Sequence, residues 1–312
     1  MDSFLIAFNA VIPFFVYMFY GFIMRRAGVT DDAFLRKLNK VVFRSFYPMI
    51  TFWNLYSIDP DMKFRLSFVL YGSGVVIIAI CLLLMIVPRF VKDRKKTGVV
   101  IQAIYRGNSL IYALPLAQNI YGKKGAILAT MAVSVIIPIY NISAVIILEH
   151  FSGKASSKKE LVKDVATNPL LIGAAAGLLF YFLKIRLPEG MNSAISALNG
   201  IATPLALFIL GGTLRFSQIG KNRRYLAWGL LFRMVIVPAA VLFITALTPF
   251  SAAERFVVFA VFATPVATAS YPMAESMGAD GELAGQFVVL STAVSVFTLF
   301  LFIFTMGNLG LL

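Results

Sequence analysis

The sequence has little of the chemistry that most enzymes use. Its 312 residues include one cysteine, Cys81, and one histidine, His150. A single cysteine excludes an intrachain disulfide and a cysteine metal cluster. The lone histidine lacks a Cys or His partner for metal binding or nucleophilic catalysis. The segment "GNSLIYALP" lacks the Gly-Lys-Ser/Thr signature of a phosphate loop. Neither an enzyme nor a bound cofactor is therefore indicated.

Charge is also scarce, because only 13% of the residues are charged while 60% are hydrophobic. A soluble domain of this length needs a polar surface that this composition does not supply. Apolar runs of about 20 residues recur along the chain instead, which is typical of spanning helices. The first run follows Asp2 rather than a basic region and has no small-residue cleavage site, so it is interpreted as a retained span. The sequence predicts an all-α integral membrane protein.

The positions of lysine and arginine predict how the chain is oriented in the bilayer. The loops after the odd-numbered spans hold 17 of these residues, and the loops after the even-numbered spans hold 7. The odd loops are therefore predicted to face the cytoplasm and both termini to face outside, in a multi-pass protein of the cell membrane. The net charge of +14 follows from these short basic loops and needs no nucleic-acid partner. The ten predicted spans lie near 4–24, 36–56, 66–88, 99–121, 125–149, 166–184, 193–214, 225–247, 255–277 and 283–307.

Two halves of the chain resemble each other. The segment "LPLAQNIYGKKG" around Pro115 has a counterpart in "YPMAESMGADG" around Pro272, and "MAVSV" has a counterpart in "TAVSV". A span opens with Leu-Asn in each half, at Asn39 and Asn199. Five spans is an odd number, so the second copy must enter the membrane from the opposite side, as in many secondary transporters with inverted repeats. The predicted units are a first repeat at 1–150, a short cytoplasmic linker at 151–165 and a second repeat at 166–312.

The fourth and ninth spans are each interrupted in mid-membrane. In the fourth span, the stretch from Gly107 to Pro115 is predicted to break the helix, and in the ninth Pro265 and Pro272 lie seven residues apart. Proline inside a helix costs about 3 kcal/mol, and the freed carbonyls must find partners away from lipid. A simple kink explains a single proline. Breakers and polar residues at corresponding places in two spans favour discontinuous helices that cross and line a cavity.

These interruptions indicate the kind of substrate. A half-helix is predicted to begin after each break, at Tyr112 to Pro115 and at Ser270 to Pro272, and its N-terminus carries about +0.5 of an elementary charge. The inverted repeat brings both positive ends to one point, where a small carboxylate fits. The half-helices before the breaks present carbonyls to a cation or to donors on the substrate. The predicted contact set also includes Asn108, Ser109, Thr264, Pro265, Thr268 and Tyr271.

Three charged residues within or near the spans are further candidates. Arg233 lies about 13 Å inside the eighth span and Arg106 about 10 Å inside the fourth, at about 1.5 Å per residue. An arginine at mid-bilayer costs at least about 2.5 kcal/mol unless it faces protein or water. An interior role is favoured for Arg233, whereas for Arg106 snorkelling to the cytoplasmic face competes evenly with binding of substrate or a structural partner. Glu275 has three interpretations: a partner of either arginine, a ligand of a coupling ion, or a solvated helix end.

Four segments, in their order and spacing, resemble the auxin efflux carrier family. They are "LNKVVFRSFYPMITFWNL", "GNSLIYALPLAQNIYG", "TPLALFILGGTLRF" and "ATPVATASYPMAESMGAD", and the resemblance extends over essentially the whole chain. The plant members of this family are the PIN-type auxin carriers. The bacterial members, which the chain resembles, are often called malate permeases.

The resemblance implies ten helices in two inverted five-helix repeats, crossing broken helices four and nine, and a homodimer. Spans 1, 2, 6 and 7 would form a scaffold, and spans 3–5 and 8–10 a transport domain that moves as an elevator. The long cytosolic loop of the plant carriers is missing here, so their regulation by phosphorylation is not expected. The Asn-Pro signature at the crossover is also altered, because Asn108 and Pro115 are not adjacent.

The predicted function is secondary active transport of a small organic anion, either a dicarboxylate or an auxin-like monocarboxylate. An anion channel and a sodium-coupled symporter of the bile-acid type are the alternatives on the same scaffold. The residues leave open the direction of transport and whether sodium, protons or no ion drives it.

The predicted orientation can be tested by labelling. A cysteine introduced at Ser156 should react with a membrane-impermeant reagent added from the cytoplasmic side, because the linker at 151–165 follows an odd-numbered span. Labelling only from the outside would overturn the topology.

Overall fold

The computed structural model describes residues 2–58, 65–152, 158–214 and 219–312. Every secondary-structure element in these residues is a helix, so the predicted all-α class is confirmed. Their only extended pairing is one isolated bridge between Gly107 and Val266. Ser156 lies outside the described residues.

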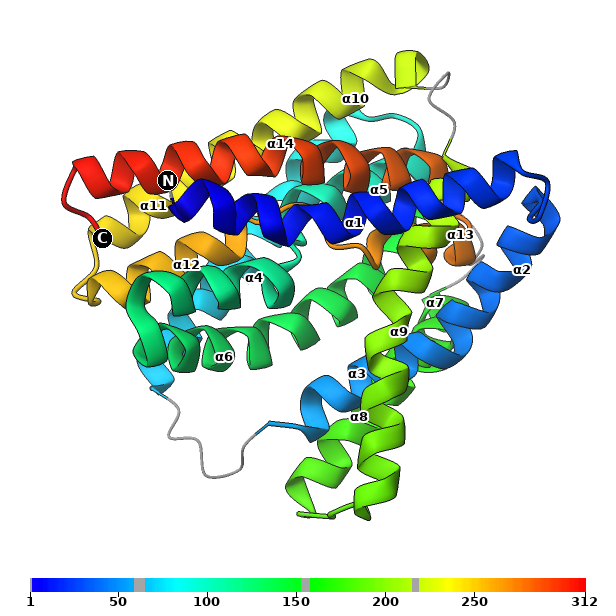
Figure 1. The fold of residues 1–312 in the computed structure, drawn as a ribbon, viewed down its shortest axis with the longest axis horizontal. Helices are drawn as coiled ribbons and strands as arrows, with labels where there is room; N and C mark the ends of the chain where they lie inside the picture. Colours follow the sequence, from blue (N-terminus) through cyan, green and yellow to red (C-terminus); the bar gives the residue numbers. More distant parts are fainter. Residues whose placement is uncertain (1, 59–64, 153–157, 215–218) are drawn as a thin grey trace.

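The helices run in this order along the chain (Figure 1): α1 (Asp2–Arg26), α2 (Asp32–Val41), the π-helix η1 (Val42–Phe46), α3 (Tyr47–Tyr56), α4 (Leu66–Phe90), α5 (Arg94–Tyr105), α6 (Ser109–Ser152), α7 (Lys158–Ala166), α8 (Pro169–Phe182), α9 (Glu189–Thr213), α10 (Ile219–Leu231), the π-helix η3 (Phe232–Ile236), α11 (Val237–Ala246), α12 (Ala252–Ala263), α13 (Ser270–Met277) and α14 (Gly281–Asn308).

The helix lengths are those of a multi-pass membrane protein. Five stretches in the described residues are long and apolar enough to cross a bilayer, and the shorter helix Pro169–Phe182 is apolar as well. The helices cover all ten predicted spans. The number of crossings and the inverted repeat stay predictions. The five stretches are Leu66–Phe90, Ser109–Ser152, Glu189–Thr213, Gly220–Ala246 and Gly281–Asn308.

The long helix α6 is two helices joined at a sharp bend. Gly122 has φ 60° and ψ −144°, a backbone conformation that L side chains rarely adopt. A Cβ atom at Gly125 would overlap the carbonyl oxygen of Ala117, eight residues earlier. In a straight helix these residues would be about 12 Å apart, at about 1.5 Å per residue. The chain therefore folds back at Gly122, and the two parts of α6 pack against each other (Figure 1).

Two π-helical turns each lie directly ahead of a proline. The turn η1 precedes Pro48, and the turn η3 precedes Pro238. Proline has no N–H to donate and its ring displaces the carbonyl four residues earlier, so a wider turn at this place accommodates it. The turn η3 carries Arg233, which is fully buried inside the protein.

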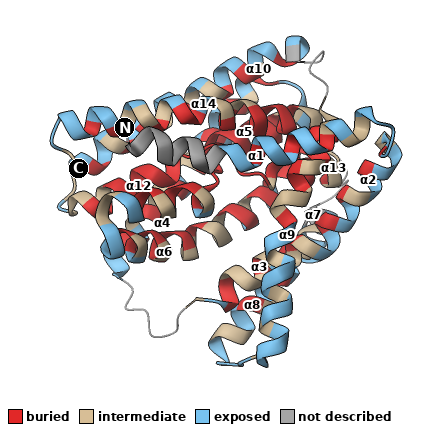
Figure 2. Ribbon diagram, in the orientation of Figure 1, coloured by how far each residue is buried: buried red, intermediate tan, exposed pale blue. Residues whose placement is uncertain are grey.

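Burial is greatest around the broken helices. Residues 97–105 of α5 are all buried, and so are residues 253–263 of α12 except Arg255, which is partly exposed (Figure 2). Around them, α1 packs against α9, and α3 packs against α8. These four helices belong to the predicted scaffold spans, although the division into scaffold and transport domain stays a prediction.

The fourth and ninth spans are discontinuous rather than kinked. Helix α5 ends at Tyr105 and α6 begins at Ser109, while α12 ends at Ala263 and α13 begins at Ser270. The first break is therefore shorter than predicted, because Pro115 lies inside α6 and not at its start. Pro272 lies in the first turn of α13, where its missing N–H removes a group that has no intrahelical acceptor. The position of Pro115 therefore did not mark the end of the first break.

Candidate functional site at the helix crossover

The two breaks meet and pair as a short antiparallel crossing. The Asn108 N–H donates to the Pro265 carbonyl at 2.9 Å, and the Ala267 N–H donates to the Arg106 carbonyl at 3.1 Å. Gly107 lies opposite Val266 in this pair. The crossing thereby satisfies several of the backbone groups that the breaks free, which matters because the bilayer interior offers no water to do so.

Only glycine fits at the centre of the crossing. A Cβ atom on Gly107 would overlap Arg233 Nη2 and the Thr264 hydroxyl, and would come within 2.9 Å of the Val261 carbonyl oxygen. Close approach of backbone to neighbouring groups is a common reason for glycine at such a position. Gly107 therefore lets the two chains and the buried arginine approach each other.

Arg233 binds the carboxyl ends of both interrupted helices. Its Nε and Nη2 donate to the Thr264 carbonyl at 2.9 and 2.6 Å, just beyond the end of α12. Its Nη1 donates to the carbonyls of Ile104 and Tyr105 at 3.2 and 3.1 Å, at the end of α5. Arg233 is 0% exposed, so it does not snorkel to an interface. The predicted interior role is a structural one, because its donors are occupied by backbone oxygens.

A cavity of about 500 Å³ lies beside the crossing. At the crossover it is lined by Arg106, Asn108, Ser109 and Thr268, and its other walls come from α1, α3, α6 and α9. The first turn of α6 and the residues just before α13 face this cavity. Their N–H groups include those without an intrahelical acceptor, so two positive helix ends border the cavity.

Arg106 is a buried cation with no acidic partner. It is 4% exposed, and its Nη2 donates to Asn141 Oδ1 at 2.6 Å while its Nη1 contacts Met273 Sδ at 2.8 Å. No carboxylate among the described residues lies within ion-pair distance of this guanidinium. A buried charge normally needs a paired opposite charge. Arg106 lines the cavity, so an anion there would supply it.

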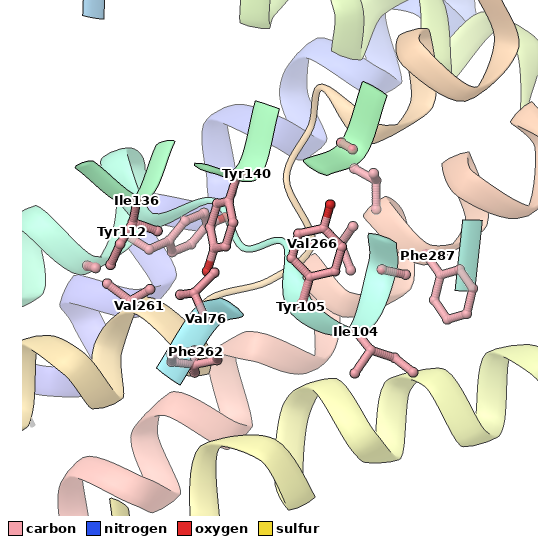
Figure 3. Close-up of a cluster of buried hydrophobic side chains, with 14 of the residues drawn as sticks. Val76, Ile104, Tyr105, Tyr112, Ile136, Tyr140, Val261, Phe262, Val266 and Phe287 are labelled. Atoms are coloured by element: carbon pink, nitrogen blue, oxygen red, sulfur yellow. The ribbon is translucent and has the colours of Figure 1, made fainter. Parts of the chain in front are cut away.

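Three further polar groups on residues that line the cavity lack partners among the described residues. The Asn108 side-chain Nδ2 and the hydroxyls of Tyr47 and Tyr140 are buried without a hydrogen bond to any described group. A buried donor left unpaired costs about 1–3 kcal/mol. Tyr140, whose hydroxyl points among the buried side chains next to the crossover, also borders the cavity (Figure 3). The cavity wall therefore carries unpaired polar groups, among them the Asn108 amide donor, that a bound anion could use.

The structure brings together only some of the residues predicted from the sequence. Arg106, Asn108, Ser109 and Thr268 line the cavity. Tyr112 lies in the first turn of α6 and packs its ring against Phe14, with the ring centroids 5.5 Å apart. The Thr264 hydroxyl accepts from Arg233 on the other side of the crossing. The predicted residues outside the cavity lining are Tyr112, Pro115, Arg233, Thr264, Pro265, Ser270, Tyr271 and Pro272.

Tyr271 and Glu275 lie in a different pocket, of about 190 Å³, with Asp32, Arg36 and Glu282. The Tyr271 hydroxyl is 2.8 Å from the Thr213 hydroxyl there. Glu275 forms no ion pair with Arg106 or Arg233 in the described structure, and its role stays a prediction. Its separation from the crossover reflects the direction of α13, whose later turns lead away from the cavity.

Several cavity residues were missed because they lie on spans that showed no break. Thr51 and Asn54 come from α3, Asn141 from α6, and Asn199 and Thr203 from α9. Each is a polar residue within an otherwise apolar run, which is the signal that could have found them. Asn199 had been noticed only as part of the repeat.

Comparison with known proteins agrees with a membrane location. A family model described as "Membrane transport protein" matches residues 6–303, nearly the whole chain. A search of curated proteins gives no match.

The close packing around Gly107 can be tested by substitution. Gly107→Ala should lower the free energy of unfolding by about 1–3 kcal/mol, the usual cost of overpacking, seen as a lower Tm in detergent. Gly74→Ala is the matched control, since a Cβ atom at Gly74 in α4 meets nothing within 4 Å. Equal Tm values for the two variants would contradict the packing described here.

Proposed function

The chain belongs to the membrane transport protein family, the auxin efflux carrier family, and from this we propose that it carries small organic anions across the cell membrane. Members of this family are transporters and not enzymes. The observation that carries the proposal is Arg106, a buried guanidinium on a cavity wall without a carboxylate partner in the described structure. A substrate carboxylate would pair with it through charge-assisted hydrogen bonds.

The ends of the helices support the same proposal. The first turn of α6 and the approach to α13 border the cavity, and each helix N-terminus acts as about half a positive charge. Asn108 Nδ2 adds an unpaired donor. In this proposal the carboxylate would lie between Arg106 and these two ends, where the guanidinium and the Asn108 amide can donate to it.

The lining favours a monocarboxylate with an apolar body over a dicarboxylate. Arg106 is the single charged side chain among the described residues of the lining, so a second carboxylate would be buried without a cation. Apolar side chains make up much of the remaining wall, including Phe14, Ile50, Ile111 and Ile137. A volume of about 500 Å³ also accommodates a ligand larger than a four-carbon diacid.

We propose that the substrate moves by alternating access. A smaller pocket of about 190 Å³ shares Asn54, Leu110 and Ile137 with the cavity and reaches Ser57 and Ile58, near the loop predicted to face outside. Towards the cytoplasmic loops, hydrogen bonds from Asn39 to Ser276 (3.3 Å) and between Thr213 and Tyr271 (2.8 Å) join α2 and α9 to α13. This arrangement favours a carrier open to the outside over a channel.

The proposed movement is an elevator motion. Helices α4–α6 and α10–α14 would move as the transport domain against a scaffold of α1–α3, α8 and α9. The scaffold would mediate a homodimer, and both termini would face outside. Breaking and remaking the contacts between α13 and the pair α2 and α9 would accompany each cycle.

Arg106→Gln tests the anion site. Purified wild-type protein should be stabilised by phenylacetate, by about 2.7 kcal/mol at about 100 times Kd, and the variant should lose this stabilisation because the counter-ion is gone. Arg224→Gln, at an exposed arginine of α10, is the matched control and should respond as the wild type does. Equal stabilisation of the Arg106 variant would place the anion elsewhere.

The same assay separates the substrate classes. Phenylacetate should raise the Tm more than succinate does, because the lining supplies one cation and an apolar wall. Phenylacetamide, which has the same shape without the charge, should have little effect. A larger shift with succinate would reverse the assignment and favour a dicarboxylate.

A further inference from the structure

The guanidinium of Arg233 lies in a cage of oxygen atoms from both broken helices. Its donors reach the carbonyl oxygens of Ile104, Tyr105, Val261 and Thr264, and the Thr264 hydroxyl, at 2.6 to 3.4 Å. Carbonyls at the ends of interrupted membrane helices, together with a hydroxyl, are the kind of ligands that hold Na⁺ in secondary transporters. Here the protein places one of its own side chains among them.

The charges of this arrangement balance. Each of the two helix carboxyl ends acts as about −0.5 of an elementary charge, so α5 and α12 together present about −1 to a single point. The guanidinium supplies +1 with a planar set of five donors, which matches several carbonyls at once. No carboxylate among the described residues is paired with Arg233, so the helix ends are its counter-charge.

The Arg233 guanidinium is closely packed on all sides and has no room to move. Arg233 is 0% exposed, and Gly107 lies so close that a Cβ atom there would overlap its Nη2. The side chain comes from the π turn η3, ahead of Pro238, which is a third element besides the two that cross. The contact therefore also ties the α10–η3–α11 segment to the crossing.

We propose that Arg233 is a resident cation that permanently occupies a cation site at the crossover. The crossing is then held together without an exchangeable inorganic cation, and η3 moves with the two broken helices as one unit. Arg233 is in this sense a positioning residue: it fixes Arg106 and Asn108 through the backbone on which they lie. This positioning role rests on the proposed anion site, whereas the role of Arg233 as a resident cation does not.

Thermal unfolding of the purified full-length protein without substrate tests the resident cation. The wild-type Tm should be unchanged when choline chloride replaces sodium chloride at equal ionic strength. Arg233→Ala should lower the Tm by several degrees and should make it depend on cations, with low guanidinium chloride restoring part of the loss relative to choline chloride. Removal of the Arg233 side chain leaves a space with the shape of a guanidinium ion, lined by the same oxygen atoms, so a free guanidinium ion can occupy it.

Arg224→Ala, at an exposed arginine on α10, controls for general effects of the salts. Guanidinium should not raise its Tm. If guanidinium shifts the Tm of the Arg224 and Arg233 variants equally, or if Arg233→Ala is as stable as the wild type, the resident cation is refuted. Sodium-dependent stabilisation of the wild type would refute it as well.

Arg233→Lys keeps the experiment decisive if the alanine variant fails to fold. Lysine retains the charge but loses the planar fork that joins the two helices. The Tm should therefore fall while staying indifferent to sodium. A Tm equal to that of the wild type would show that bridging by the guanidinium is not needed. Because none of these measurements uses a carboxylate, a failure of the anion site would appear only in the phenylacetate assay.

Discussion

Backbone groups inside a membrane must find hydrogen-bond partners within the protein, and the crossover exists only because this requirement is met. Two helices that break in hydrocarbon expose carbonyls before the break and N–H groups after it. The bridge between Gly107 and Val266 satisfies some of them, and the guanidinium of Arg233 satisfies carbonyls at the ends of both α5 and α12. The Val266 N–H donates to the Ser291 hydroxyl, and the first turn of α6 borders the cavity.

The crossing is therefore electrically asymmetric. The negative helix ends converge on Arg233, and the positive ends converge on the cavity beside Arg106. Both arginines are buried, yet their surroundings differ: Arg233 is surrounded by backbone oxygens, whereas Arg106 holds only Asn141 and Met273 and faces open space. The first is held as part of the fold. The second faces the cavity, which is why we propose that the anion binds there.

Sequence reasoning located both breaks but placed the end of the first one too far along the chain. The break in the fourth span was predicted to extend from Gly107 to Pro115, yet α6 starts at Ser109 and runs through Pro115. A proline one or two turns inside a helix loses one hydrogen bond and can be carried by its neighbours, whereas the actual interruption needs a residue without a side chain. Gly107 is that residue, because the guanidinium and two oxygens occupy the space a Cβ atom would take.

Composition and hydropathy were sufficient to predict the all-helical membrane class, the positions of the helices and the two interrupted spans. A helix in lipid needs a long apolar run, so a polar break within such a run is easily recognised. The position of Asn108 at the cavity followed from the break itself, whereas the sequence left the position of Arg106 open and the structure placed it on the cavity wall. The partners of Arg233, the separation of Glu275 and Tyr271 from the crossover, and the contribution of Asn54, Asn141 and Asn199 came from the folded chain. These depend on which faces of distant helices meet, and a periodicity along one helix carries no information about the face of another.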